Sequence, residues 1–264
     1  MNILYVGDVM GEVGIKVIEK ILPKLRQTKG IDLVVAQAEN VSDGKSMTVA
    51  DYRRLKKAGV DAFTGGNHTP TKEEIIPLLN DPKTPVMGPA NMPDCPGPGY
   101  KYVNTIQSIV LVISLLGQTV GKGAGREVNN PLKAIDKILE QEKATKKDAI
   151  VINFHGDFSS EKVVIGHYLD GRASVVVGDH WHVPTADARV LPGRTAHMTD
   201  VGMCGALNSS LGVTYDSIVP RWRDGKQTKN QLETNGPTQF NAVLVSVGEN
   251  GLADSIEHIQ QIFD

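Results

Sequence analysis

The sequence contains only two cysteines, Cys95 and Cys204, so no disulfide framework is expected to support the fold. Aromatic residues make up 5% of the chain, and 28 lysines and arginines face 30 aspartates and glutamates. A near-neutral chain with few aromatics lacks the basic, aromatic-rich surface with which proteins bind duplex or single-stranded nucleic acid. A small anionic substrate is not excluded, because a bound metal ion can dominate the local charge.

Long hydrophobic runs are also missing. No apolar segment is long enough to cross a bilayer, so we expect no membrane association. Met1 leads directly into an apolar segment, without a charged n-region or a cleavage site, which favours a cytoplasmic protein with both thiols reduced. At 40% hydrophobic residues the chain can bury a substantial core, and no linker divides it. We therefore expect a single domain over residues 1–264.

Short apolar segments alternate with amphipathic ones along the chain. The pattern predicts strands at residues 3–6, 33–38, 61–64, 109–115, 149–154, 173–177 and 240–247. Helical spacing predicts helices at residues 13–25, 50–58, 73–79 and 131–142. This alternation argues for an α/β core with a largely parallel sheet. Residues 100–115 and the segment after Arg189 favour hairpins, so the sheets are expected to be mixed, and the tail reads as polar and mixed.

Polar side chains follow five of the predicted strands. Ligands of open α/β sheets bind at the carboxyl ends of the strands, so we expect these side chains to converge. The residues are, in strand order, Asp8; Glu39 and Asn40; Asn67 and His68; His155; and His180 and His182.

The chemistry of this set fits metal ions. Carboxylate, amide and imidazole groups suit Fe, Mn, Zn or Co rather than calcium, and the candidates are too many for one tetrahedral zinc site. A carboxylate reaching two metal ions would hold them about 3.5–4 Å apart. In such a site a bridging hydroxide forms near neutral pH and attacks phosphorus in line.

Each of these residues, taken alone, also has an ordinary structural explanation besides metal binding. An aspartate after a strand is commonly a turn residue, and the histidines of His180–His182 could be exposed loop residues, although alternate residues of an extended segment point the same way. The Gly66–His68 segment is more specific, because glycines allow a tight turn that presents both side chains. The glycines after the first strand match neither a dinucleotide nor a P-loop motif. Asp157 is either an orienting partner of an imidazole or a solvated carboxylate.

The conjunction of these motifs resembles the calcineurin-like metallophosphoesterases, and within them the bacterial YmdB-like family, over nearly the whole chain. The resemblance implies a four-layer α/β/β/α sandwich with two mixed sheets between helices. The segments that carry it are Gly7–Gly11, Ala38–Asn40, Gly66–His68, Phe154–His155, Asp170–Ser174, Gly178–Val183 and Thr199–Met203.

The resemblance also implies roles for the polar residues. They are Asp8, Asn40 and His182 on one metal ion, Asn67, His155 and His180 on the other, and Glu39 bridging the two. His68 would protonate the departing ribose oxygen. The sequence departs from the wider superfamily at Met10, where a histidine ligand is usual, and Asn40 would take its place. The metal ions would be iron in many members, with Mn or another transition metal as the alternative.

The function implied is that of a dinuclear metal-dependent phosphodiesterase acting on 2′,3′-cyclic nucleotides, with 3′,5′-cyclic nucleotides as a further substrate type. The alternatives are a phosphomonoesterase or an RNA-end nuclease using the same site, and a non-catalytic regulatory or RNA-binding module. The complete ligand set and the missing basic, aromatic surface oppose the last. The segment 120–130 departs from the family in detail and would border the substrate pocket. A homodimer or larger assembly is expected.

Overall fold

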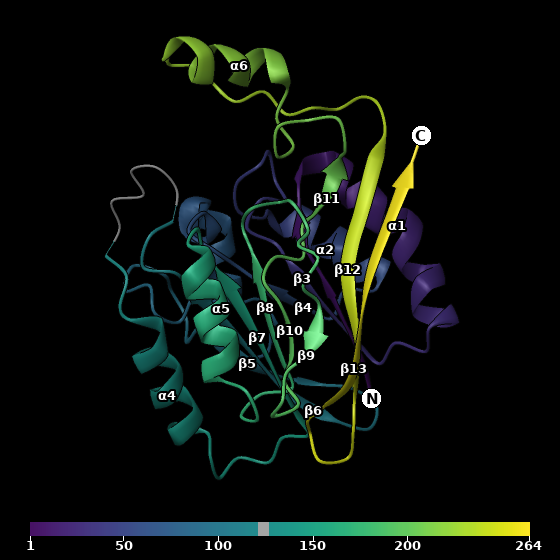
Figure 1. Ribbon diagram of the computed structural model, residues 1–264, viewed down its shortest axis with the longest axis vertical. Helices are drawn as coiled ribbons and strands as arrows, with labels where there is room; N and C mark the ends of the chain where they lie inside the picture. Colours follow the sequence, from purple (N-terminus) through teal and green to yellow (C-terminus); the bar gives the residue numbers. More distant parts are fainter. Residues whose placement is uncertain (121–126) are drawn as a thin grey trace.

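The computed structural model describes residues 1–120 and 127–264, which form two mixed β-sheets (Figure 1). The first sheet has the strand order β2 (Asp8–Val9), β11 (Met203–Ala206), β12 (Thr238–Val247), β1 (Asn2–Val6), β3 (Leu33–Gln37) and β4 (Ala62–Thr64). An additional strand, β13 (Ala253–Phe263), pairs with β12. The second sheet has the order β5 (Tyr100–Asn104), β6 (Ile109–Leu116), β7 (Ala149–His155), β8 (Val175–Asp179), β10 (Ala196–Met198) and β9 (Arg189–Val190).

Each sheet contains a block of neighbouring parallel strands. In the first sheet β1, β3 and β4 run parallel, whereas β12 is antiparallel to β1, β11 and β13. In the second, β6, β7, β8 and β10 run parallel, and the antiparallel pairs β5/β6 and β9/β10 form its two edges. The expected mixed sheets and both expected hairpins are confirmed.

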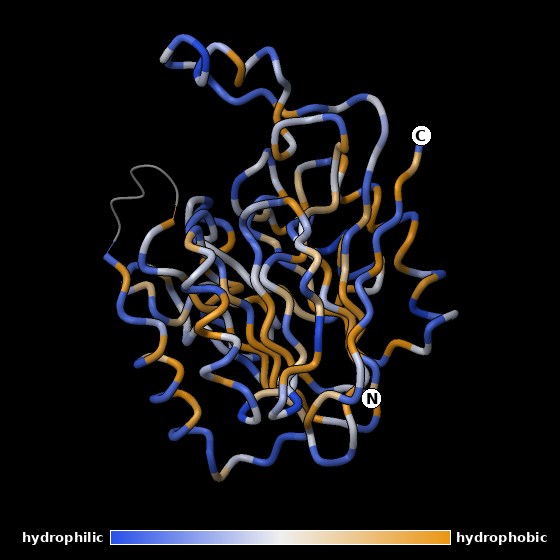
Figure 2. The backbone as a smooth tube through the Cα atoms, in the orientation of Figure 1, coloured by the Kyte–Doolittle hydropathy of each residue, from blue (hydrophilic) through white to orange (hydrophobic). Residues whose placement is uncertain are grey.

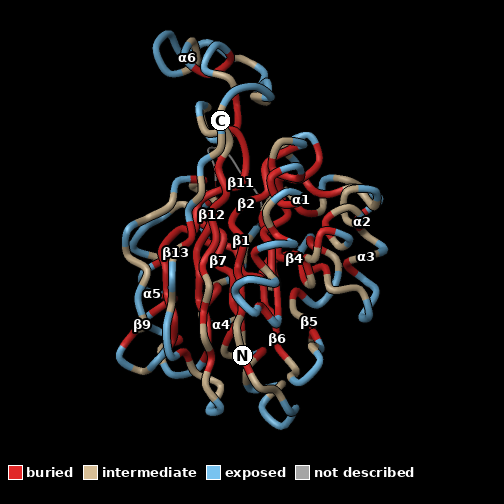
Figure 3. The backbone as a smooth tube through the Cα atoms, turned by 90° about the vertical axis from the view of Figure 1, so that its right-hand side faces the viewer, coloured by how far each residue is buried: buried red, intermediate tan, exposed pale blue. Residues whose placement is uncertain are grey.

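Helices cover the outer face of each sheet, which completes the expected four-layer arrangement (Figure 1). The helices α1 (Gly11–Thr28) and α2 (Val49–Ala58) pack on the first sheet, and α4 (Pro131–Gln141) and α5 (Ser159–Tyr168) on the second. Successive strand residues point to opposite faces, so Leu4 joins the cluster under α1 while Tyr5 joins the cluster between the sheets. Most strands are apolar and buried over most of their length, as Figures 2 and 3 show, whereas β9 and β13 are largely exposed or half-buried. Both faces of each sheet are therefore covered, and the single-domain expectation stays a prediction.

Three elements were not predicted from the sequence. Helix α5 turns Lys162 inward, fully buried, and leaves Val164 48% exposed, so its polarity is inverted. Strand β13 is an edge strand with mostly polar residues, formed by the tail whose polar, mixed sequence predicted no particular element. Helix α6 (Tyr215–Asp224) stands apart at one end of the molecule (Figure 3). Amphipathic periodicity is the signal from which an element packed on the core is predicted. α5 and β13 lack a regular form of it, whereas α6 has it but contains Pro220 in its interior, which argues against a helix.

Two predicted boundaries also changed. The helix expected at 73–79 is a 3-10 turn, η2 (Glu73–Ile75), followed by α3 (Ile76–Asn80), because Pro77 sits in the first turn of α3 and has no N–H to continue an earlier helix. The strand expected at 173–177 is β8, which reaches Asp179. Cys95 and Cys204 are both buried thiols. No helix among the described residues is long and apolar enough to span a bilayer.

Candidate metal centre

The predicted polar residues all lie at or just beyond the carboxyl ends of β1, β3, β4, β7 and β8. Asp8 is held in β2 by pairing with β11, and His155 is the last residue of β7. The remaining residues follow β3, β4 and β8 within a few positions. Because parallel strands end at the same edge, the two sheets bring these loops together. The residues after β4 lead into a second 3-10 turn, η1 (Thr69–Thr71), which His68 precedes.

Glu39 is the centre of the cluster. Its Oε1 lies 3.1 Å from His155 Nε2, and its Oε2 accepts a hydrogen bond from the His68 backbone N–H at 2.9 Å. Burial alone would raise the pKa of Glu39, but the neighbouring His155 and His68 lower it, so the carboxylate stays charged. Gly66 lies so close that a Cβ there would clash with the Glu39 carboxylate and the His155 ring. Glycine is thus required at the position before Asn67.

Asp8, Asn40 and His182 form the second part of the cluster. His182 Nε2 lies 3.6 Å from Asp8 Oδ1 and 3.2 Å from Asn40 Nδ2. Asp8 Oδ2 accepts a hydrogen bond from the His180 backbone N–H at 3.2 Å. Burial, followed by the nearby Asp179, raises the pKa of Asp8 well above its usual value. A cation is the group that would offset this concentration of buried carboxylates.

Each of the three histidines has one ring nitrogen held by an acceptor. His155 Nδ1 lies 2.5 Å from Asp179 Oδ1, and His180 Nε2 lies 3.0 Å from Asp157 Oδ1. His182 Nδ1 lies 3.1 Å from the Leu211 carbonyl. An acceptor on one nitrogen fixes the ring and leaves the other nitrogen available as a ligand, as in many metal sites. Asp157 is therefore the residue that orients the His180 imidazole.

The pKa values of two of these rings suit metal binding. Burial lowers the pKa of His180 and of His182 to about 4, so both rings are neutral near pH 7. His155 differs: burial opposes its charge, but the carboxylates of Glu39 and Asp179 outweigh that effect and raise its pKa well above the usual value. A ring placed between two carboxylates lies where positive charge is strongly favoured.

Sequence reasoning missed Asp179 as a site residue. Its Oδ1 also accepts a hydrogen bond from Gln37 Nε2 at 3.1 Å, and its Oδ2 accepts from the Tyr5 hydroxyl at 2.8 Å and from Asn153 Nδ2. These donors come from β1, β3 and β7, in both sheets. The available signal was its place at the end of a predicted strand next to His180.

We expect Asp179→Asn to weaken metal binding roughly 10–100-fold, because an amide neither holds the His155 ring as firmly nor supports its basicity. Isothermal titration with Mn²⁺ measures this directly. Asp254→Asn, a change at an exposed carboxylate on β13, is the matched control and should bind the metal as the unaltered chain does. Equal affinities for all three proteins would contradict the orienting role.

A buried ion pair supports the segment that carries two of the histidines. His180 and His182 both adopt left-handed backbone, with φ of 100° and 61°. Between them, the Trp181 backbone N–H donates to Asp200 Oδ2 at 2.9 Å. The same oxygen pairs with Lys162 Nζ at 2.6 Å, and that Nζ lies 3.9 Å from the Trp181 ring centroid. The pair thus stabilises a backbone conformation that non-glycine residues rarely adopt.

We expect Lys162→Met to destabilise the fold by about 3–5 kcal/mol, because it leaves Asp200 buried without its cation. Urea unfolding followed by circular dichroism measures the change. Lys143→Met removes an exposed lysine from a surface pair and should change the free energy of unfolding by less than about 1 kcal/mol. A Lys162→Met protein as stable as this control would show that the ion pair supports nothing.

The donor set fits a metal ion on its own chemistry. Asp8 Oδ1 and Asn67 Oδ1 are buried and have no hydrogen-bond partner among the described residues. Such oxygens are costly to bury unless something else satisfies them. Ligand atoms of Glu39, His155 and His180 lie within 4.8 Å of one another, close enough to share an ion.

The fold and this cluster define a metallophosphoesterase-like protein. A model of the YmdB-like protein family matches residues 4–259, and the chain belongs to that family. It is 36% identical over 250 residues to the 2′,3′-cyclic-nucleotide 2′-phosphodiesterase of Bacillus subtilis (strain 168), covering 94% of this chain and 92% of that one.

Two solved structures share the complete fold. A hypothetical protein from Thermus thermophilus superposes with a TM-score of 0.89 at 34% identity, over 99% of both chains. A phosphatase from Mycoplasma pneumoniae superposes with a TM-score of 0.90 at 27% identity, over 99% of this chain and 93% of that one. The similarity therefore extends over the strands that carry the cluster as well as the sheets around it.

Proposed function

We propose that this protein is a metal-dependent phosphodiesterase that hydrolyses 2′,3′-cyclic nucleotides. The observation that carries the proposal is the convergence of unsatisfied oxygens of Asp8 and Asn67 with three histidines whose remote nitrogens are each held by an acceptor. Such an arrangement suits a metal-dependent hydrolase. The name of the Bacillus subtilis relative supplies the substrate class.

In this proposal the cluster holds two metal ions, in the arrangement implied by the family. Their ligands are Asp8, Asn40 and His182 for one ion, Asn67, His155 and His180 for the other, and Glu39 for both. Imidazole and carboxylate together suit iron, with Mn as the nearest alternative. Bound metal ions would supply positive charge that stabilises the phosphate in the transition state and lowers the pKa of the attacking water.

His68 has a separate task in the proposal. Its backbone N–H contacts Glu39, which places the residue directly beside the cluster, and its side chain is half-buried. Opening a cyclic phosphodiester expels a ribose oxygen, which is a poor leaving group without a proton. We assign His68 as the acid that delivers this proton.

The test is metal content measured together with hydrolysis of 2′,3′-cyclic AMP after reconstitution with iron or manganese. About two metal ions per chain and turnover of the cyclic nucleotide are the expected result. Metal binding without cyclic-nucleotide hydrolysis would redirect the activity to phosphomonoesters or RNA ends. Neither metal nor activity would overturn the proposal in favour of a binding module.

A further inference from the structure

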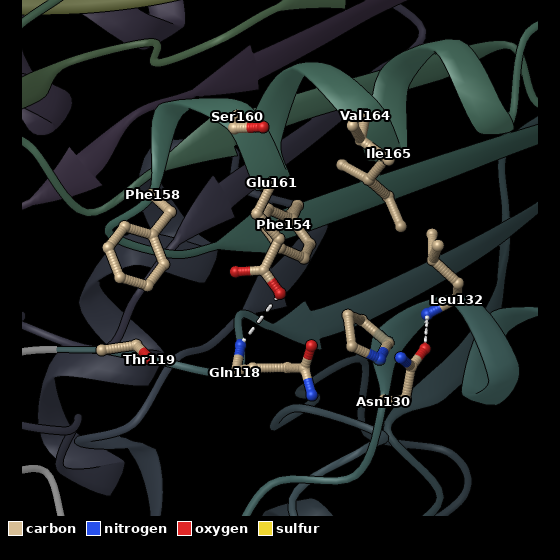
Figure 4. A pocket seen from close by; sticks show the side chains of 11 residues that line it. Gln118, Thr119, Asn130, Leu132, Phe154, Phe158, Ser160, Glu161, Val164 and Ile165 are labelled. Atoms are coloured by element: carbon tan, nitrogen blue, oxygen red, sulfur yellow. Dashed lines mark hydrogen bonds between the residues drawn. The ribbon is translucent and has the colours of Figure 1, made fainter.

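A pocket of 530 Å³ lies at the outer side of the second sheet (Figure 4). It lies between the start of α4 and the first two turns of α5, beyond the end of β6 and against Phe154 near the end of β7. Its volume is within the usual range of small-molecule sites. Of the segment 120–130 that was expected to border a substrate pocket, Asn130 lines this one, and residues 121–126 lie outside the described part of the chain.

The pocket and the cluster share two loops. The Gly117 backbone N–H donates to the His155 carbonyl at 2.8 Å, and the next residue, Gln118, lines the pocket. Asp157 pairs with His180, and the next residue, Phe158, lines the pocket. Consecutive Cα atoms are about 3.8 Å apart, so in both loops the pocket begins one residue from the cluster. The pocket and the cluster are therefore neighbours along the chain in both loops.

The walls of the pocket suit a flat, partly apolar ligand. Phe154, Val164 and Ile165 supply apolar surface. Phe158 also lines the pocket and is 57% exposed, which is unusual for an aromatic side chain (Figure 4). An aromatic ring beside a phosphate site is the group on which nucleobases stack.

Glu161 is the charged residue among the described residues that line the pocket. The other polar side chains there are those of Gln118, Thr119, Asn130 and Ser160. Glu161 Oε1 accepts a hydrogen bond from the Gln118 backbone N–H at 3.1 Å (Figure 4). Its Oε2 is buried and has no hydrogen-bond partner within the described chain. Burial raises the pKa of Glu161, which reflects a carboxylate with too few donors around it. A ligand that donates an N–H to Oε2 would remove this penalty.

We propose that this pocket binds the base of the nucleotide, with Phe158 against its face and Glu161 Oε2 accepting a hydrogen bond from its exocyclic amino group. Adenine, cytosine and guanine carry such a group, whereas uracil presents carbonyl oxygens that a carboxylate repels. The inference rests on the proposed function, and it adds a preference for amino-bearing bases over uracil.

The test compares kcat/KM for 2′,3′-cyclic AMP, 2′,3′-cyclic UMP and the base-free substrate glycerol 1,2-cyclic phosphate. Phe158→Ala should lower the ratio of cyclic AMP to glycerol cyclic phosphate about tenfold, through KM, because stacking is lost. Glu161→Gln should lower the ratio of cyclic AMP to cyclic UMP about tenfold, because an amide also donates to a uracil carbonyl. Trp222→Ala, at an exposed aromatic on α6, is the control and should change neither ratio.

Unchanged ratios in Phe158→Ala and Glu161→Gln, with hydrolysis of all three substrates intact, would overturn the base pocket and leave the proposed function standing. If no cyclic phosphate is hydrolysed, the proposed function fails. Calorimetric binding of adenosine 3′-monophosphate then tests the pocket separately. Weaker binding by Phe158→Ala than by Trp222→Ala would support it, and equal binding would overturn it.

Discussion

Replacing Glu39 by glutamine is expected to remove at least one metal ion and to lower kcat/KM for 2′,3′-cyclic AMP by about a thousandfold or more. Glu39 is buried at the centre of the cluster, where its two oxygens face His155 and His68. An amide has nearly the same shape but carries no charge, so it cannot draw two cations together or offset their repulsion. Metal analysis by mass spectrometry, with kinetics on the same sample, measures both effects.

Glu257→Gln is the control for this experiment, since Glu257 lies exposed on β13 in a surface pair with Lys29. Its metal content and activity should match those of the unaltered chain. Circular dichroism of both variants separates loss of metal from loss of fold. If Glu39→Gln kept two metal ions and full activity, the bridging role proposed for Glu39 would be wrong.

His68→Ala should have an effect that depends on the leaving group. With 2′,3′-cyclic AMP the rate is expected to fall roughly 10²–10⁴-fold, because the ribose oxygen needs a proton as it departs. With a 4-nitrophenyl phosphodiester the loss should be less than about tenfold, since nitrophenolate leaves without one. Measuring kcat for both substrates at saturating metal gives the comparison.

Two controls test whether the activity of His68→Ala falls because a proton donor is lost. Metal content should be unchanged, because His68 is assigned no metal ion. His258→Ala, at a position on the edge strand β13, should affect neither substrate. Equal losses on the two substrates would assign His68 to substrate binding or to the structure of the loop instead of to proton transfer.

The order of strands and helices, and the residues at the strand ends, were predictable because they depend on short-range patterns. A strand such as β6 is predicted from its long apolar run, which only Ser114 interrupts, and a polar residue directly after a strand must lie near the sheet edge. The eight predicted site residues follow from this rule together with the family resemblance. Their assignment to particular metal ions stays a prediction.

The tertiary structure alone decided which groups support the cluster. Asp179 meets Tyr5, which is 174 positions away, and Asp157 pairs with His180 and not with its sequence neighbour His155. No local pattern encodes such contacts. The first joins the two packed sheets, and the second joins the loops that follow the neighbouring strands β7 and β8.

Helix α5 is a further case in which the sequence pattern does not predict the tertiary contacts. Periodicity places apolar residues inward, yet here Lys162 is buried against Asp200 while Val164 faces the pocket. The sequence by itself determined which residues could do chemistry and where along the chain the strands end. The packing of the second sheet and its helices decided which of those residues are oriented, and where a pocket opens. The reason is physical: ion pairs and cavities depend on partners that only the folded chain brings into contact.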